Sequence, residues 1–556
     1  MKRIKPSILL FILIILTLGF SRCTNKPDKQ AVSDQLSLKI ASIATDSTLT
    51  VGEPILQLDL IDQLYQKGNG LLSQKWDAEN NVRELLSAIE NATQNGLNPE
   101  DYHLTSINYL IEKIANSNPT SAEDVAELEL LLTDSFLLLA SHLAAGKTNA
   151  TKIDPQWNAA KRDLEINWPT FVDSVLQAEK IAETLESLVP HHFQYTNLQK
   201  ALLKYRSIQA DGGWAAFNPT EPKLVKGMSH PDVILLRNRL AKTQGFISID
   251  TSDSTLFDES LHQQLLIFQR RNGLTPDGTL GPKTVEALNI TVDQRIETIA
   301  ANLERWRWID DSLGAKHIMV NIADFNMQLI ENRKVVFETE AIVGRTYRRT
   351  PVFSSMMTFM VLNPDWTVPP TILNNDIIPA VRKNIRYLAQ KNMKVITREG
   401  KEVDPSKIDW QKASSGNFPY MIRQMPGKDN ALGQVKFMFP NSHNVYIHDT
   451  PTRDLFNQTE RTFSSGCIRI NRPIEFAKIL VETHPSVAAE DIDRLLKQPN
   501  PKTIRFTQAI PVHLIYLTSW ADDEGTVYFR PDIYDRDAIL VAALKQAYER
   551  PNLAAN

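Results

Sequence analysis

Apolar residues recur at spacings of three and four along the first third of the chain, from Gly52 to about Trp214. This spacing places them on one face of each helix, where they can form a core. It is clearest in residues 82–89 and 128–140, and the sequence Gly-Leu-Asn-Pro at 96–99 interrupts the helical pattern. We therefore predict a helical scaffold domain over residues 49–215, with the leucine stripes in its core.

Three shorter amphipathic segments follow in the middle of the chain. They cover residues 233–240, 261–271 and 284–288, and turn sequences separate the last two at Pro276-Asp277-Gly278 and Gly281-Pro282. Three short helices joined in this way form a compact bundle. We predict a small three-helix domain over residues 229–290.

The pattern changes after Trp308 to short runs that are typical of strands. Strands are predicted at 317–321, 327–330, 335–337, 359–362, 512–517 and 526–529, with a hairpin turn at 331–333 and helices at 473–482 and 491–497. These elements predict a mainly-β domain over residues 315–540. The expected fold class is therefore multidomain α+β.

Two further strand-like runs carry the candidate chemistry. Tyr446 and His448 alternate with apolar residues and are expected on one face, and Cys467 and Arg469 alternate in the same way. The residues between these runs are rich in Asp, Thr, Pro, Arg and Asn, which predicts a loop that lets the two strands lie side by side. Cys467 is the only cysteine outside the N-terminal leader, so this pairing brings a lone thiol near an imidazole.

A free thiol has a pKa of roughly 8.5, so a nucleophilic cysteine needs a neighbouring base at neutral pH. His448 can accept that proton and return it to a leaving amine. Gly466 permits a tight turn whose amides can face an oxyanion, and Arg469 can hold a carboxylate with two hydrogen bonds. A buried structural cysteine beside a surface histidine is the plain alternative. A metal site of His443, His448 and Cys467 is disfavoured because zinc sites use closer ligand pairs, and structural ones need four ligands.

The sequence Tyr-Ile-His-Asp at 446–449, followed by Ser-Ser-Gly-Cys-Ile-Arg at 464–469, resembles the active-site signature of L,D-transpeptidases with a YkuD-type catalytic domain. It is most similar to the large, lid-bearing YcbB-like subgroup, which shares a serine before the glycine where many members have histidine. The resemblance implies Cys467 as nucleophile and His448 as base, without a cofactor or metal. We assign substrate binding to Tyr446, Ser465, Gly466 and Arg469 of this signature.

Three other regions fit the same resemblance. Residues 366–434 precede the active-site strands and include a helical pattern over 372–390, which indicates a lid inserted in the catalytic domain. Residues 268–284 resemble the peptidoglycan-binding-type 1 domain, although residues 229–290 can instead only brace the catalytic domain. The helical segment that ends near Asp211-Gly212-Gly213-Trp214 is similar to the scaffold of the YcbB-like subgroup.

The N-terminus indicates export. A basic segment at 1–5 precedes an apolar run from Ile8 to Phe20, which is short for a membrane span and typical of a signal sequence. Cys23 and the residues around it resemble a bacterial lipoprotein signal, except that Arg22 stands where a small residue is usual. An uncleaved anchor and an ordinary cleaved signal are the alternatives to lipidation. Residues 24–48 are rich in Ser, Thr, Asp and Lys and are predicted to be a flexible tether to the membrane.

The remaining sequence features narrow the class of partner. The formal net charge of −4 over 556 residues gives no electrostatic basis for nucleic-acid binding, and two cysteines exclude a disulfide framework. By resemblance, Cys467 attacks the carbonyl of the third residue of a peptidoglycan tetrapeptide stem and expels the terminal D-Ala. The resulting thioester then reacts with the side-chain amine of a neighbouring stem, which gives a 3-3 crosslink. An L,D-carboxypeptidase or other cysteine peptidase would use the same residues with water as acceptor, and a non-catalytic wall-binding anchor is a further alternative. The sequence indicates no oligomeric state.

Overall fold

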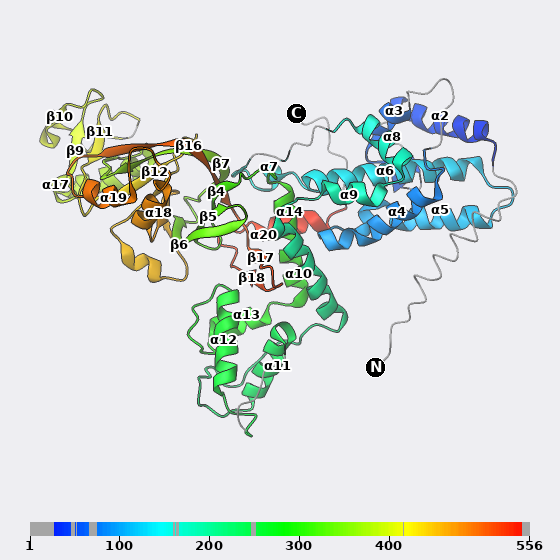
Figure 1. The fold of residues 1–556 in the computed structure, drawn as a ribbon, viewed down its shortest axis with the longest axis horizontal. Helices are drawn as coiled ribbons and strands as arrows, with labels where there is room; N and C mark the ends of the chain where they lie inside the picture. The colour runs from blue at the N-terminus through cyan, green and yellow to red at the C-terminus, as the bar shows by residue number, and fades with distance from the viewer. Residues whose placement is uncertain are drawn as a thin grey trace.

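The computed structural model describes residues 27–45, 50–51, 53–65, 75–159, 162, 166–245, 252–414 and 416–547. Within them, a helical N-terminal domain, a three-helix domain and a closed β-sheet with a small inserted sheet follow one another (Figure 1). This arrangement confirms the multidomain α+β fold class. The predicted leader, residues 1–23, lies outside the described residues.

Helix α6 (Ala122–Ala145) is the central element of the N-terminal domain. Ser121 caps it by accepting a hydrogen bond from the Asp124 amide. The helix is long and apolar enough to cross a membrane, but 89% of its most apolar window is buried inside the protein, so it is a core helix. The helices around it are α3 (Leu58–Tyr65), α4 (Glu79–Glu90), α5 (Leu104–Asn116), α7 (Ala150–Ile153), α8 (Trp168–Ala178), α9 (Ile181–Leu188) and α10 (Phe193–Ala210), with the short strands β1 (Thr50–Val51) and β2 (Glu53–Pro54).

Most of the predicted tether is helical. Residues Lys29–Thr45 form helix α2, which packs on α6. Val32, Leu36 and Ile40 repeat at four-residue intervals, and all three are buried. The prediction of a flexible tether was wrong for this segment because polar residues dominate its composition and conceal a narrow apolar stripe.

The three-helix domain has a hydrophobic core of its own. Its helices are α11 (Asp232–Gln244), α12 (Glu259–Arg271) and α13 (Pro282–Asn289), as the amphipathic pattern predicts. Helix α14 (Val292–Arg307) then leads to the β-domain, and its buried Arg307 pairs with Glu304 one turn earlier at 2.6 Å.

The β-domain is built on a sheet whose strand path closes on itself. The order is β12-β13-β15-β6-β5-β4-β16-β7-β3, and β12 pairs with β7 as well as with β13. The predicted hairpin turn at 331–333 is confirmed, since β5 ends at Glu331 and β6 begins at Lys334. The strands are β4 (Lys316–Asn321), β5 (Asn326–Glu331), β6 (Lys334–Gly344), β7 (Val352–Leu362), β12 (Val435–Met438), β13 (Ile447–His448), β14 (Thr462–Ser464), β15 (Ile468–Ile470), β16 (Lys502–Ile515), β17 (Ser519–Ala521) and β18 (Val527–Phe529), and the helices are α18 (Pro473–Leu480), α19 (Ala489–Leu496) and α20 (Asp537–Lys545).

The helical domain contributes one strand to this sheet. Strand β3 (Trp157–Asn158) pairs in parallel with the start of β7, where Trp157 lies opposite Val352. A single hydrophobic core runs from the N-terminal helices into the sheet. The helical domain and the β-domain therefore pack against each other and are not independent domains joined by a linker.

The insertion at 366–434 forms a small separate sheet with its own core, at the end of the molecule opposite helix α2 (Figure 1). Its strand order is β10-β9-β11-β8. The helix predicted over 372–390 is broken into short pieces, because Pro379 lacks an N–H and a π-helical turn precedes it. The elements are β8 (Trp366–Thr367), α15 (Pro370–Ile372), a π-turn (Leu373–Ile377), α16 (Ile378–Lys383), α17 (Tyr387–Gln390), β9 (Met393–Ile396), β10 (Glu402–Val403) and β11 (Met421–Gln424).

Candidate active site

Strands β13 and β15 lie side by side, as the sequence predicts, and the structure shows that they pair in parallel. Their register places Ile447 opposite Ile468 and His448 opposite Arg469. Tyr446 directly precedes β13 and Cys467 directly precedes β15. The two side chains interact, and the Tyr446 ring contacts that of His448, so Cys467 lies close to both. The paired strands thus bring Tyr446, His448, Cys467 and Arg469 close together.

The imidazole of His448 is fixed by one backbone carbonyl. Its Nδ1 lies 2.6 Å from the carbonyl oxygen of Asp449. A carbonyl only accepts hydrogen bonds, so Nδ1 carries the proton and Nε2 keeps its lone pair. Burial lowers the pKa of His448, and together with the charges of Arg469 and Lys436 it brings that pKa to about 3. The ring is therefore a neutral base at physiological pH.

Asp449 is itself held tightly, which positions its carbonyl. Its carboxylate accepts hydrogen bonds from the Gln434 amide at 2.8 Å and the Thr450 amide at 2.6 Å, and it pairs with Arg453. Gly433 packs on this carboxylate so closely that a Cβ there would lie 2.3 Å from its Cγ. Glycine is thus required at 433 for the approach of Asp449.

The thiol of Cys467 is protonated in the resting site. Burial raises the pKa of Cys467 to about 11, although the Tyr446 amide and the charge of Arg469 act in the opposite direction. In agreement, Sγ lies 3.7 Å from the carbonyl oxygen of Asn444, to which only an S–H group can donate. Among the described residues, no hydrogen bond joins Cys467 to His448, so the resting pair is a neutral thiol next to a neutral imidazole.

The turn before Cys467 is organised by Ser464. Its hydroxyl donates to the Cys467 carbonyl at 2.6 Å and accepts from the Gly466 amide at 3.0 Å. Gly466 has a φ of +116°, which favours glycine, and Thr350 donates to its carbonyl at 2.9 Å. The Gly466 N–H donates to Ser464 in this conformation, so the expectation that amides of this turn face an oxyanion stays a prediction.

Comparison with known families identifies the β-domain. Residues 315–503 match the profile of the L,D-transpeptidase catalytic domain. The β-domain is an L,D-transpeptidase catalytic domain. Residues 59–202 match the scaffold domain family, and residues 229–288 match the peptidoglycan binding domain family.

Individual relatives agree with these domain matches. A Haemophilus influenzae protein whose name assigns it to the L,D-transpeptidases is 34% identical over 282 residues, which cover 50% of this chain and 56% of that protein. The chain thus spans about half the length of this relative. A solved L,D-transpeptidase fragment from Xylanimonas cellulosilytica is 13% identical, with a TM-score of 0.16 over 54% of this chain and all of the fragment. The avibactam carbamoyl enzyme of Ldtfm gives 13% identity and a TM-score of 0.18, over 37% of this chain and 51% of that chain.

Arg469 adds a positive charge next to Cys467. Its Nε is buried without a hydrogen-bond partner in the described part of the chain. Burial lowers the pKa of Arg469, and the nearby Arg345 lowers it further. A guanidinium without a carboxylate partner, next to Cys467, suits an anionic group of a substrate.

Tyr446 connects the nucleophile to the insertion. Its ring lies 5.5 Å from that of His448, measured between centroids. Burial raises the pKa of Tyr446, the neighbouring Cys467 raises it further, and a hydrogen bond with Trp366 lowers it. Trp366 is the first residue of the insertion, so the start of the insertion contacts Tyr446.

Sequence reasoning missed Arg348, which touches the site from the connection between β6 and β7. Its Nη1 donates to the Ser465 hydroxyl at 2.9 Å and to the Asp376 carboxylate at 2.9 Å. It also missed Ser464, although the two consecutive serines at 464 and 465 could have indicated a second functional hydroxyl in this turn. No local pattern points to Arg348, because its partners lie far away in the sequence. His443, from the alternative metal site, packs its ring 4.9 Å from that of Phe353.

Proposed function

We propose that this chain is a cysteine-dependent L,D-transpeptidase that forms 3-3 crosslinks in peptidoglycan. The observation that supports this most directly is the orientation of His448, whose protonated Nδ1 is fixed on Asp449 so that its free Nε2 can serve Cys467. The family of the β-domain and the peptidoglycan binding match support the same substrate. The YcbB-like subgroup fits the scaffold domain and the inserted lid.

The reaction follows from the neutral resting pair. Cys467 Sγ attacks the carbonyl carbon of the bond between the third stem residue and the terminal D-Ala, while His448 Nε2 takes the thiol proton. The tetrahedral intermediate collapses, the C–N bond breaks, and the imidazolium returns the proton to the leaving D-Ala amine. A thioester on Cys467 remains.

The second half reverses these proton transfers. The side-chain amine of a neighbouring stem attacks the thioester and gives a proton to His448. The C–S bond then breaks, and the imidazolium reprotonates the thiolate. Arg469 holds a carboxylate of a stem, and the lid closes over the thioester to exclude water, which would otherwise give a carboxypeptidase product.

The test is to incubate the full chain with purified disaccharide-tetrapeptide and identify the products by mass spectrometry. We expect a crosslinked dimer that lacks one D-Ala, and its loss in Cys467→Ala, since the nucleophile is removed. His443→Gln, a change at a surface histidine, is the matched control and should still form dimer. Free tripeptide without dimer would make the protein an L,D-carboxypeptidase, and unchanged substrate would make it a wall-binding anchor.

An acylating inhibitor tests the nucleophile separately. A carbapenem should add its mass to the peptide that contains Cys467, because it presents a reactive acyl group to the same thiol. Labelling of another peptide, or none, would refute the assignment of Cys467.

We also propose that the chain is exported and held in the cell envelope by its N-terminus, through lipidation of Cys23 or through the apolar segment itself. The basic and apolar pattern of residues 1–23 supports this. Cell fractionation of the wild type and Cys23→Ser tests it. Release of only the variant from membranes indicates lipidation, and recovery of the wild type in the cytoplasm would refute export.

A further inference from the structure

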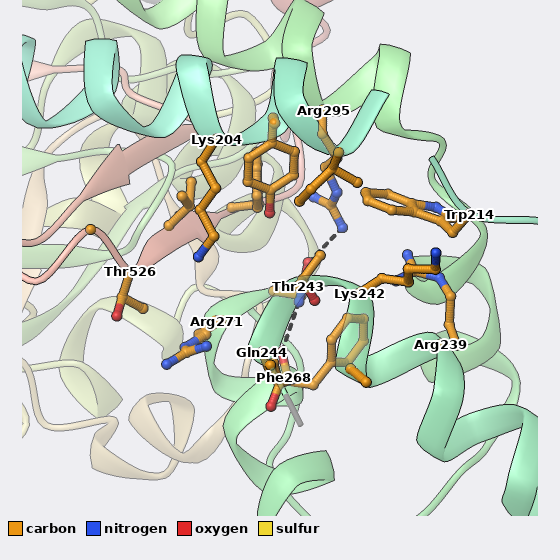
Figure 2. A pocket seen from close by; sticks show the side chains of 18 of the residues that line it. Lys204, Trp214, Arg239, Lys242, Thr243, Gln244, Phe268, Arg271, Arg295 and Thr526 are labelled. Atoms are coloured by element: carbon orange, nitrogen blue, oxygen red, sulfur yellow. Dashed lines mark hydrogen bonds between the residues drawn. The ribbon is translucent and has the colours of Figure 1, made fainter. Parts of the chain in front are cut away.

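A cavity of about 650 Å³ lies where the three-helix domain meets helix α10 and the β17–β18 hairpin (Figure 2). It is separate from the active site, since none of its lining residues belongs to the β13–β15 region. Its volume suits one small ligand. Its cationic lining residues are Lys204, Arg239, Lys242, Arg271 and Arg295, against a single lining carboxylate, Glu524.

Arg239 is a buried, charged residue of this cavity with a hydrogen-bond donor that is unsatisfied in the described chain. Its side chain is almost fully buried, with 6% of the residue exposed, and Nε donates to the Leu288 carbonyl at 2.9 Å. The guanidinium stacks 4.0 Å from the ring centroid of Trp214, whose indole is anchored on the Ile290 carbonyl. Nη1 is buried and has no hydrogen-bond partner within the described residues. A buried donor of a charged group without an acceptor is costly unless a ligand supplies one.

Arg295 places a second buried charge beside the first. It is also 6% exposed, donates to Asn272 Oδ1 at 2.5 Å and stacks 4.1 Å from the Phe529 ring. Burial lowers the pKa of Arg295 to about 10, and burial together with the charge of Arg295 lowers the pKa of Arg239 to about 10. Both remain charged at neutral pH, and no carboxylate of the described chain offsets either of them. An anion in the cavity would remove this penalty.

The rest of the wall suits a ligand with polar and apolar faces. Gln244 has both its side-chain nitrogen and oxygen buried without partners in the described part of the chain. Phe268 also lines the cavity, and Lys204 projects from helix α10 toward it (Figure 2). Aromatic walls with a few unsatisfied polar groups are typical of small-ligand sites.

We propose that this cavity binds a carboxylate-bearing muramyl-peptide unit of peptidoglycan, with Arg239 and Arg295 on the carboxylate and Lys204, Lys242 and Arg271 around it. The choice of a wall fragment rests on the proposed function. Arg239, Lys242 and Arg271 belong to the segment that matches the peptidoglycan binding family. Lys204 comes from the scaffold, and Arg295 lies on the linking helix α14. A bound unit would therefore contact the binding domain, the scaffold and the linking helix together.

The test uses a ligand that the active site cannot process. N-acetylmuramyl-L-alanyl-D-glutamate carries carboxylates but lacks the bond that Cys467 attacks. Its affinity for full-length Cys467→Ala is measured by calorimetry and compared with that of its fully amidated form. Two double variants are made in the same background. Lys204→Gln/Lys242→Gln removes two charges at the cavity, whereas Lys200→Gln/Lys283→Gln removes two exposed charges on α10 and α13 outside it.

We expect the Lys204→Gln/Lys242→Gln variant to bind the muramyl peptide at least tenfold more weakly than the Cys467→Ala background. The Lys200→Gln/Lys283→Gln variant should bind it less than twofold more weakly. Amidation of the ligand should weaken binding to the background at least tenfold. Arg239→Gln should abolish binding, and its melting temperature shows whether the fold survives. Equal affinities for the two double variants, or tight binding of the amidated ligand, would overturn the proposal. Since the titration involves no turnover, a failure of crosslinking would refute the proposed function and leave this result standing. Tighter binding of inorganic phosphate than of the muramyl peptide would also overturn the carboxylate assignment.

Discussion

Asp376 of the lid and Ser465 of the cysteine turn accept hydrogen bonds from the same atom, Nη1 of Arg348, each at 2.9 Å. The Arg348 side chain is largely buried, whereas Asp376 is well exposed. One guanidinium thus joins the insertion to the segment that ends in Cys467. Because the insertion has its own hydrophobic core, we expect it to move as a unit that this contact restrains.

Replacement of Arg348 should loosen that restraint. Arg348→Ala is expected to raise the hydrolysed fraction of product and to lower crosslinking roughly fivefold, which corresponds to about 1 kcal/mol for the lost hydrogen bonds. Hydrogen exchange should rise at the π-turn that contains Asp376, while β9 and β11 stay protected by their core. Arg386→Ala, which removes an exposed charge from the lid, is the control. Equal product ratios in both variants would show that the Arg348 contact does not restrain the lid.

The protonated state of Cys467 predicts an unusual alkylation profile. Since burial raises its pKa to about 11, the rate of reaction with iodoacetamide should rise about tenfold per pH unit between pH 7 and 10. Peptide mapping separates Cys467 from Cys23. A plateau reached below pH 8 would instead indicate a preformed thiolate and imidazolium pair.

His448 should make the fold sensitive to acid. Its pKa is lowered to about 3 in the folded chain, and the unfolded histidine titrates near 6.5, so the unfolded state binds more protons between these values. The stability that the neutral ring contributes is present above pH 6.5 and is lost as pH falls toward 3. His448→Gln should therefore reduce the fall in melting temperature from pH 7 to pH 4, and His443→Gln should not. The same fall in both variants and the wild type would contradict the lowered pKa.

Arg469 should contribute through the shape of its guanidinium as well as its charge. Arg469→Lys keeps the charge but loses the planar pair of donors, so kcat/KM is expected to fall about tenfold, and Arg469→Gln should cost more. Melting temperatures of both variants should stay near that of the wild type, because Arg469 has no ion pair in the described chain. Unchanged kinetics in Arg469→Lys would exclude recognition by a planar fork.

Ser464 should matter more than its neighbour Ser465 for the geometry of the nucleophile. Ser464→Ala removes the hydrogen bonds to the Cys467 carbonyl and the Gly466 amide, at a cost of about 1 to 3 kcal/mol in stability. Crosslinking should fall with it, because the turn no longer fixes Cys467. Ser464→Thr keeps the hydroxyl and should recover part of the activity. Equal activity of Ser464→Ala and the wild type would show that backbone contacts alone hold the turn.

Local patterns predicted the elements whose signal lies within a few residues. The hairpin at 331–333 and the strands that carry His448 and Cys467 follow from alternation and turn residues, and the structure confirms both. Helix α2 was missed because its three core residues are scattered among polar ones. Its partner α6 lies about ninety residues away, and only the folded chain shows that a stripe this narrow is covered.

The site was predictable where one motif holds the chemistry and not where distant segments meet. Cys467 and His448 stand out by residue type and spacing. Arg348 and the carbonyls of Asn444 and Asp449 have no such signal, since their roles depend on the closed sheet and on which backbone groups it leaves facing the thiol and the imidazole. The four-stranded sheet of the lid was likewise hidden, because its strands β8 and β11 pair across more than fifty residues.

Strand β3 makes the N-terminal helices part of the catalytic sheet, and this has a consequence for how the protein can be divided. A fragment that begins at residue 315 would leave the start of β7 with unpaired backbone groups and strip the helices from a shared apolar surface. Such a fragment is expected to aggregate through this exposed edge and apolar surface. The helical region and the β-domain therefore form one inseparable folding unit, whereas the three-helix domain and the lid each have a hydrophobic core of their own.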